Sequence, residues 1–486
     1  MNPERGVEIK LRTFEELSNK DFIGNQIINE EEERDELDKK DWDKNISVIN
    51  PEGKKIQTKE DIQFQYAINM FVDKIHLAEQ FISIMPTYYD DSGLWWVWNF
   101  KERKWELKDD IELLNKVKNS SGANIVSGKE RQEIINALKQ VGRKNRPEDI
   151  KPQWLQFKDQ IVDLETGEKF EATPRYFVTN PIPWRLGKSD ETPTMDKIFE
   201  QWVGKKYVKT MYEIIAYCML PDYPIHRLFC FHGEGLNGKS CYLRLLRKFI
   251  GNANVSATEL DILLKSRFEI TRLYKKLVCQ MGETNFGEIS KTSILKKLTG
   301  GDTIGFEYKN KTPFEAVNYA KIIIATNNLP PTTNKTIGFY RRWMIIDFPN
   351  KFDEKIDILG AIPDEEYENL GMKSIGILID LLKKREFSEE GTIEERMEKY
   401  EAKSNFLEKF INDFVEEDID GYITVSDFYK KFMEWCTENR HRPMAKQSVS
   451  KEMKKLHYES GKRRFDWLYD GKGGDARVWN NIKWKV

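Results

Sequence analysis

Gly233-Glu234-Gly235-Leu236-Asn237-Gly238-Lys239-Ser240 matches the pattern G-x-x-x-x-G-K-[ST]. The apolar run 227–232 before it has the composition of a short strand, and the segment 241–250 after it has the character of a helix. Strand, glycine-rich loop and helix in this order are typical of a loop that wraps the phosphates of a nucleotide. The sequence therefore predicts an α/β fold with a P-loop core and a central parallel sheet.

The residue types of this loop suit phosphate chemistry. Glycines at 233, 235 and 238 allow the backbone to curl so that its N–H groups point at a phosphate. Lys239 can reach the β- and γ-phosphates, where we expect a catalytic role, and Ser240 can offer its hydroxyl to Mg²⁺. We therefore expect ATP and Mg²⁺ as cofactors, with nucleotide contacts along Gly233, Glu234, Gly235, Leu236, Asn237, Gly238, Lys239, Ser240 and Cys241.

Two later apolar runs end in polar residues that can act on the same phosphates. The run 276–281 leads to Glu283, which would bind the metal beside Ser240 or polarise the attacking water. The run 321–326 ends in Asn327, which is placed to sense the γ-phosphate as a catalytic amide. Each has a simpler interpretation: Glu283 as a surface residue at a strand end, and Asn327 as part of a turn.

Arg341 and Arg342 stand directly before a fourth apolar run, 344–348. A guanidinium at this place is suited to reach the γ-phosphate of a neighbouring subunit and to stabilise the charge that develops during hydrolysis. This interpretation implies a ring with active sites between subunits. Read alone, the pair also fits a solvated edge, and the sequence does not choose between the two arginines.

Composition excludes several classes of protein. The chain has 486 residues, which predicts two to four domains, and 39% of them are hydrophobic, too many for wholesale disorder. The five cysteines never form a Cys-x-x-Cys pair, which argues against a disulfide framework and a zinc site. No apolar run approaches the roughly 18 to 20 residues that cross a bilayer, and no secretory signal is visible. We therefore expect a cytoplasmic protein, in the host cytoplasm if the source is a virus or plasmid.

The two ends of the chain carry opposite charge. Residues 1–61 hold 11 basic and 17 acidic residues, whereas residues 421–486 hold 15 basic and 8 acidic ones. The basic end predicts a polyanionic partner, although a solvated charged face would look the same. A helix, a turn, a second helix and two strands are expected there, which makes a winged helix plausible. The second helix would bind DNA through Lys446, Lys451, Lys454 and Lys455, although winged helices also serve as protein contacts.

Together these motifs resemble the superfamily III helicases, which are AAA+-like, and specifically their phage, plasmid and poxvirus-type primase-helicase branch. The segments 295–302 and 306–311 carry the most discriminating likeness. The resemblance implies a hairpin that projects into a central pore, where Lys309 and Lys311 would neutralise phosphates of single-stranded DNA. Phe306 and Tyr308 would either stack on bases or pack within the protein.

The resemblance implies an ATP-dependent DNA helicase of a virus, plasmid or integrated element. It implies a homo-oligomeric ring, expected to be a hexamer, that moves on single-stranded DNA and unwinds forked duplex, with a separate primase or polymerase as a partner. A replication initiator that melts an origin without processive unwinding, or an ATPase that acts on protein partners, remains open. The expected domains are a charged segment (1–61), an α+β domain (62–190), the ATPase domain (191–385), and a connector with the basic winged helix (386–486).

Overall fold

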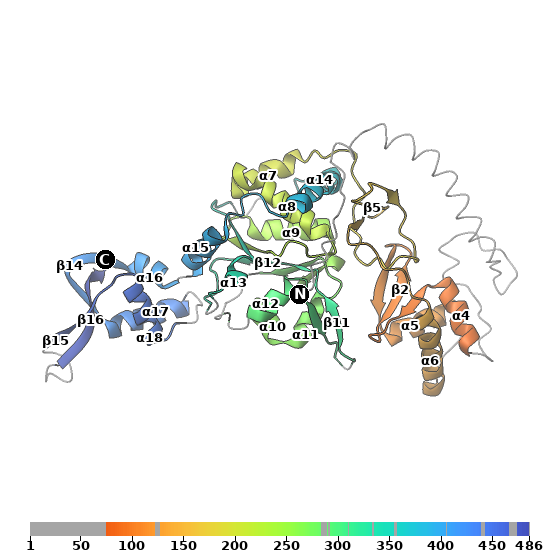
Figure 1. Ribbon diagram of the computed structural model, residues 1–486, viewed down its shortest axis with the longest axis horizontal. Helices are drawn as coiled ribbons and strands as arrows, with labels where there is room; N and C mark the ends of the chain where they lie inside the picture. Colours follow the sequence, from red (N-terminus) through yellow and green to blue (C-terminus); the bar gives the residue numbers. More distant parts are fainter. Residues whose placement is uncertain are drawn as a thin grey trace, which may run out of the picture.

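The computed structural model describes residues 74–121, 127–282, 289, 292–309, 311–332, 335–353, 357–404, 406–438, 443–465 and 474–485. The expected segment 1–61 therefore lies outside the described residues. Three bodies follow one another along the longest axis of the molecule in Figure 1, with the α/β body in the middle. The region before residue 190 lies at one end and the C-terminal body at the other.

The middle body contains a sheet of five parallel strands in the order β13-β7-β12-β9-β8. Every residue of β12 is buried, as expected for a strand that is covered on both faces. The predicted α/β core with a central parallel sheet is confirmed. The strands are β7 (Leu228–His232), β8 (Val255–Ala257), β9 (Val278–Met281), β12 (Lys321–Thr326) and β13 (Trp343–Asp347).

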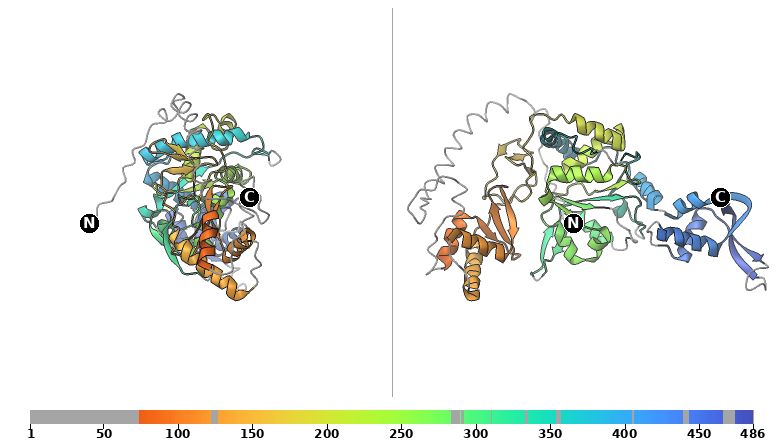
Figure 2. Two further views of the ribbon diagram at one scale, coloured as in Figure 1. Left: turned by 90° about the vertical axis from the view of Figure 1, so that its right-hand side faces the viewer. Right: turned by 180° about the vertical axis from the view of Figure 1, so that it is seen from behind.

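Helices cover both faces of this sheet, as Figure 2 also shows from behind. Because successive side chains of a strand point to opposite faces, Ile323 and Ala325 of β12 enter one core cluster while Ile322 and Ile324 enter the other. The first cluster contains α7 (Pro193–Val203), α8 (Val208–Met219), α9 (Lys239–Ile250) and α14 (Asp364–Lys384). The second contains α10 (Leu260–Lys265), α12 (Thr292–Leu298), α13 (Ile337–Tyr340) and α15 (Ile393–Ser404).

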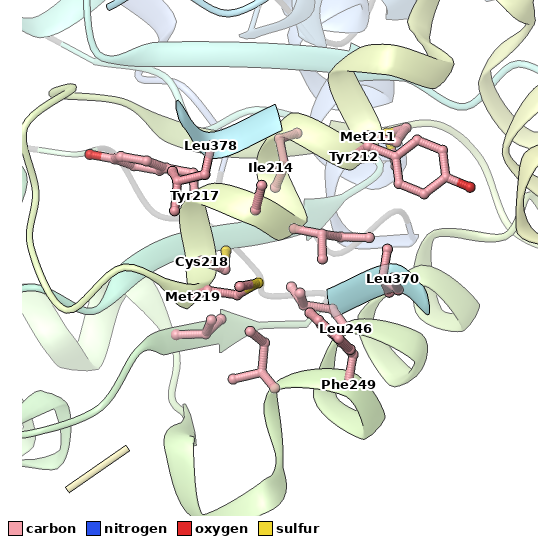
Figure 3. Packing of buried hydrophobic residues seen from close by; sticks show 14 of the residues in the cluster. Met211, Tyr212, Ile214, Tyr217, Cys218, Met219, Leu246, Phe249, Leu370 and Leu378 are labelled. Carbon is pink, nitrogen blue, oxygen red and sulfur yellow. The ribbon is translucent and has the colours of Figure 1, made fainter. Parts of the chain in front are cut away.

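The first core cluster fixes α9 against its neighbours. Figure 3 shows side chains of α8, such as Ile214 and Met219, close to Leu246 and Phe249 of α9 and to Leu370 of α14. Burying large apolar side chains contributes roughly 1.5 to 3 kcal/mol each, so this interface holds the N-terminus of α9 at a defined place beside the sheet.

Short elements complete the middle body. A two-stranded hairpin, β10 (Thr303–Phe306) and β11 (Phe314–Val317), lies apart from the main sheet. The short helices are η1 (Lys205–Tyr207), η2 (Asn252–Asn254), α11 (Arg267–Ile270) and η3 (Thr271–Leu273).

The body before residue 190 has two small antiparallel sheets and three helices among the described residues. Trp95, Trp96, Trp98 and Trp105 are all nearly inaccessible to solvent, so the aromatic run is core packing. The elements are α4 (Lys74–Ile84), β1 (Thr87–Tyr89), β2 (Trp95–Asn99), β3 (Lys104–Lys108), α5 (Asp110–Ser121), α6 (Gly128–Lys144), β4 (Trp154–Gln156), β5 (Ile161–Asp163) and β6 (Lys169–Phe170).

The C-terminal body combines three helices with a three-stranded antiparallel sheet of order β14-β16-β15. Its core joins Phe410, Phe428 and Phe432 of the helices with Trp479 of the sheet. The elements are α16 (Phe406–Phe414), β14 (Val415–Thr424), α17 (Val425–Glu438), α18 (Lys446–Lys455), β15 (Ser460–Phe465) and β16 (Gly474–Trp484). Across the described part of the chain, no helix has the length and apolar character needed to span a membrane.

Candidate nucleotide site and nucleic-acid surfaces

The glycine-rich loop joins the carboxyl end of β7 to the first residue of α9, Lys239. A Cβ atom at Gly233 would collide with the amide of Asn237 and would lie 2.6 Å from the Phe348 carbonyl oxygen. Gly238 has φ +94°, and a Cβ atom there would lie 2.5 Å from the Trp202 ring. These two glycines are therefore required by close approach, and the loop is wound tightly between its neighbours.

Lys239 is the centre of the site. Its side chain is almost completely buried, and its Nζ donates to the carbonyl oxygens of Gly233 at 2.6 Å and Glu234 at 2.8 Å. It also donates to Oδ1 of Asn237 at 3.0 Å and to Oδ1 of Asn327 at 3.2 Å. The structure thus places Lys239 and Asn327, which are 88 positions apart in sequence, in direct contact.

This contact follows from the strand order. β7 and β12 are parallel neighbours, so Lys239 follows the end of one strand and Asn327 follows the end of the other. The backbone N–H of Gly233 also donates to the Thr326 carbonyl oxygen at 3.3 Å, which ties the start of the loop to β12. Ligands of open α/β sheets bind outside the carboxyl ends of such strands, so the geometry suits a phosphate.

The outer side of the loop faces solvent. Glu234, Gly235, Leu236 and Ser240 are exposed, Cys241 is half-buried, and no atom would lie within 4 Å of a Cβ atom at Gly235. Leu236 has φ +60°, a conformation that costs a non-glycine residue about 1 to 3 kcal/mol. The loop therefore presents free backbone surface where a phosphate would bind.

Only one of the two predicted metal ligands lies among the described residues. Ser240, the predicted hydroxyl ligand, is exposed at the start of α9. Glu283 lies outside the described residues, directly after the described end of β9 at Met281 and Gly282. Within the described ranges, no cluster of three His, Cys, Asp or Glu side chains forms a metal site.

The structure separates the two adjacent arginines. Arg342 is buried, and its guanidinium donates to the Thr299 hydroxyl at 2.9 Å, to the Lys296 carbonyl oxygen at 3.3 Å, and to the Gly338 carbonyl oxygen. Arg341 is exposed at the end of α13, with no side-chain hydrogen bond or ion pair to any described residue. Of the two arginines, Arg341 is therefore the one whose guanidinium is not held by the described part of the chain.

A charged cluster next to the loop could not be found from the sequence. The carboxylate of Asp347, at the end of β13, lies 3.0 Å from Nδ1 of His232, 2.7 Å from Nζ of Lys403 and 3.0 Å from Nζ of Lys399. Burial opposes its ionisation, but the hydrogen bonds from His232 and Lys403 and the charge of Lys399 hold the pKa of Asp347 far below its ordinary value. Its members come from β7, β13 and α15, so no local motif marks it.

Comparison with known proteins finds two family models and a curated relative that match parts of the chain. Residues 231–342 match DUF5906, a family of unknown function, and residues 402–478 match the poxvirus D5 protein-like family. A protein of Acanthamoeba polyphaga mimivirus, provisionally named a helicase, is 23% identical over 318 residues, which cover 58% of this chain and 33% of that protein. The chain is thus similar in part to a poxvirus protein family and to a viral protein provisionally named a helicase. It spans about a third of the length of this curated relative.

Solved structures also align with this chain. The A form apo structure of the NrS-1 C-terminal region is 13% identical, with a TM-score of 0.44, and the match covers 85% of this chain and 100% of that one. A second A form structure of the same region is 16% identical with the same TM-score, and covers 79% of this chain and 86% of that one.

The four residues of the β10–β11 hairpin region that were predicted to contact DNA are of two kinds in the structure. Phe306 is fully buried, and its ring stacks on Phe314 with centroids 5.6 Å apart. Tyr308 is half-buried and stacks on the other side at 6.2 Å from Phe314, and burial raises its pKa to about 12. Packing therefore describes both aromatic rings, whereas Lys309 and Lys311 are exposed beside the turn.

The predicted DNA-contacting lysines of α18 are all exposed. Val449 and Met453 of the same helix are buried in the C-terminal core. Given the helical period of 3.6 residues, Lys451, Lys454 and Lys455 lie on the face opposite these two side chains. Lys455 forms an ion pair with Glu452, and Lys446 lies 5.9 Å from the Tyr429 ring centre. The helix thus presents an outward basic face, and its DNA contacts stay a prediction.

Proposed function

We propose that the chain is an ATP-driven motor that moves along single-stranded DNA and unwinds duplex. The contact between Lys239 and Asn327 carries this proposal, because it joins a buried ammonium and an exposed amide at the carboxyl ends of adjacent parallel strands. A cation at a helix N-terminus beside a glycine-rich loop suits phosphate groups and little else.

The residues of the loop fit ATP. Backbone N–H groups of 233–240 would cradle the phosphates, and Lys239 would exchange its bonds to the loop carbonyls for phosphate oxygens. Asn327 would orient the attacking water or sense the γ-phosphate. ATP supplies the phosphoryl bond, and Mg²⁺ would neutralise phosphate charge with Ser240 and Glu283 as its protein ligands.

A ring of identical subunits completes the site. We assign the guanidinium that reaches the neighbouring subunit to Arg341, because it is exposed and bonds to no described residue, while Arg342 is bonded within its own subunit. A hexamer is the arrangement that the family resemblance implies. In this ring Lys309 and Lys311 would line the pore and pull on DNA phosphates.

The exposed basic face of α18 favours a second candidate, an initiator that binds and melts an origin without processive unwinding. Both functions need ATP and DNA, and a separate primase or polymerase would act beside either one. Measuring unwinding as well as hydrolysis separates them.

The test compares the wild type with Lys239→Ala, with Lys248→Ala as the matched control. Lys248 lies on the same helix, but its Nζ contacts Asp364 at 3.2 Å, far from the loop. We expect hydrolysis of ATP that single-stranded DNA stimulates, unwinding of a forked duplex, and loss of both in Lys239→Ala but not in Lys248→Ala. Hydrolysis without unwinding would support the initiator, and equal activity of the two variants would refute the nucleotide site.

A further inference from the structure

The β15–β16 hairpin carries a basic surface that the sequence motifs did not single out. Figure 1 shows the hairpin projecting beyond α17 and α18 at the C-terminal end of the molecule. Lys462 and Arg464 of β15 and Arg477 of β16 are exposed. We call these three residues the hairpin basic face.

The strand register places all three on one side of the sheet. Lys462 pairs directly with Arg477, and Arg464 pairs with Asp475 two positions farther along. Alternate residues of a strand share a face, so Arg477 lies on the same side as Trp479, which packs in the C-terminal core with α18. The hairpin basic face thus continues the side of the sheet that carries the helices.

Among the described residues, no carboxylate lies within ion-pair distance of Lys462, Arg464 or Arg477. Other cations of this sheet are engaged: Lys483 binds Glu416 at 3.3 Å and Asp418 at 3.0 Å, and the Arg463 guanidinium lies 4.5 Å from the Tyr422 ring centre on the opposite face. The face of Lys462 and Arg477 shows no such contact among the described residues, although Asp475 lies across from Arg464 on that face.

Protection of a sheet edge does not explain the arrangement. Charged residues on an edge strand discourage pairing with other chains, and β15 is an edge strand. However, Arg477 lies on the central strand, directly opposite Lys462, and like charges opposite each other destabilise a sheet. Such a pair is expected where an anion from another molecule binds between the two cations.

We propose that the hairpin basic face binds the phosphate backbone of duplex DNA. β14 pairs with β16 only over 478–484, so from Arg477 back to Gly474 the sheet narrows to a two-stranded ribbon, a shape that fits a DNA groove. Lys462, Arg464 and Arg477 would each neutralise a phosphate, next to the outward lysines of α18. This inference rests on the proposed function only in that DNA is the partner.

The test uses the full chain and the anisotropy of a fluorescein-labelled DNA duplex, titrated from about 50 to about 200 mM salt. Each phosphate contact contributes about 0.9 to the slope of log affinity against log salt. We therefore expect the slope to fall by about 2 in the double variant Lys462→Gln/Arg477→Gln and by about 1 in Arg464→Gln. Arg463→Gln is the matched control, an adjacent arginine on the opposite face, and should leave the slope unchanged.

A second readout separates direct contact from damage to the fold. Relief of the repulsion between Lys462 and Arg477 should raise the midpoint of thermal unfolding of Lys462→Gln without DNA, while its affinity for DNA falls. Affinity and unfolding midpoint that fall together would overturn the proposal of direct contact. A wild-type slope in the double variant, an equal loss in Arg463→Gln, or no duplex binding by the wild type would also overturn it. Loss of binding in the double variant without any ATP hydrolysis by the wild type would refute the motor and leave this surface standing.

Discussion

Replacing Arg341 and Arg342 separately by alanine tests whether two adjacent residues have different tasks. Arg342→Ala removes a buried guanidinium that binds the Thr299 hydroxyl and the carbonyl oxygens of Lys296 and Gly338. Arg341→Ala removes an exposed side chain. We expect Arg342→Ala to lower the stability of the fold. We expect Arg341→Ala to lower ATP hydrolysis at the site of the neighbouring subunit.

The magnitude follows from the lost hydrogen bonds. A buried acceptor left without its donor costs about 1 to 3 kcal/mol, and Arg342→Ala leaves three acceptors, of which water can satisfy some. We estimate a loss of about 3 kcal/mol in the free energy of unfolding, which corresponds to about 6 to 12 °C in the unfolding midpoint of a body of this size. Arg341→Ala should change the free energy of unfolding by less than about 0.5 kcal/mol.

Two assays separate the outcomes. Thermal unfolding can be followed by the fluorescence of the 13 tryptophans, to which the buried Trp343 beside Arg342 contributes. ATP hydrolysis in mixtures of wild type and Arg341→Ala should fall more steeply than simple dilution, because each variant subunit also disables the site of its neighbour. Equal stability of the two variants would refute the structural task of Arg342, and a linear loss in the mixtures would refute a guanidinium supplied between subunits.

Three further changes have defined outcomes. Lys309→Ala combined with Lys311→Ala should abolish unwinding of a forked duplex, as measured by strand displacement, because both cations are exposed on the hairpin. Gly238→Ala should weaken binding of a fluorescent ATP analogue at least tenfold, because its Cβ atom would lie 2.5 Å from a tryptophan ring, whereas Gly235→Ala has open space. Burial lowers the pKa of Lys321 from 10.5 to about 7, so the unfolded chain binds more protons between these values. Stability should therefore rise by up to about 1.4 kcal/mol per pH unit from pH 7 to pH 10, and urea unfolding of Lys321→Met should lack this rise.

The strand, loop and helix of the candidate nucleotide site were predictable because their signals are local. The glycine spacing of 233–238 and the apolar run before it define a strand, a loop and a helix, and each is present. Asn327 was predictable as well, because a polar residue at the end of a parallel strand lies at the same sheet edge as the loop. The pattern could not show that Lys239 and Asn327 touch, since that distance depends on the strand order.

The separate roles of Arg341 and Arg342 could not be predicted from the sequence. Both residues follow the same short helix, and they differ only in the direction in which each side chain points. Arg342 turns inward toward Thr299, whose own hydroxyl also donates to the Leu295 carbonyl oxygen at 2.8 Å. Similarly, the exposure of Phe306 could not be decided from an aromatic residue beside lysines. Its burial depends on Phe314 across the hairpin and on Tyr274, whose ring centre lies 5.3 Å away.

The packing of the connector after residue 385 could not be predicted from the sequence either. Sequence alone groups α15 with the C-terminal body, but Tyr400 of α15 packs in the second core cluster of the sheet and donates its hydroxyl to the Pro330 carbonyl oxygen at 2.6 Å. Lys399 and Lys403 bind Asp347 next to the loop, whereas Phe406 of α16 packs in the C-terminal core. The change from one core to the other thus follows α15. The C-terminal body is therefore attached through a helix that rests on the strand ends where we place the nucleotide phosphates.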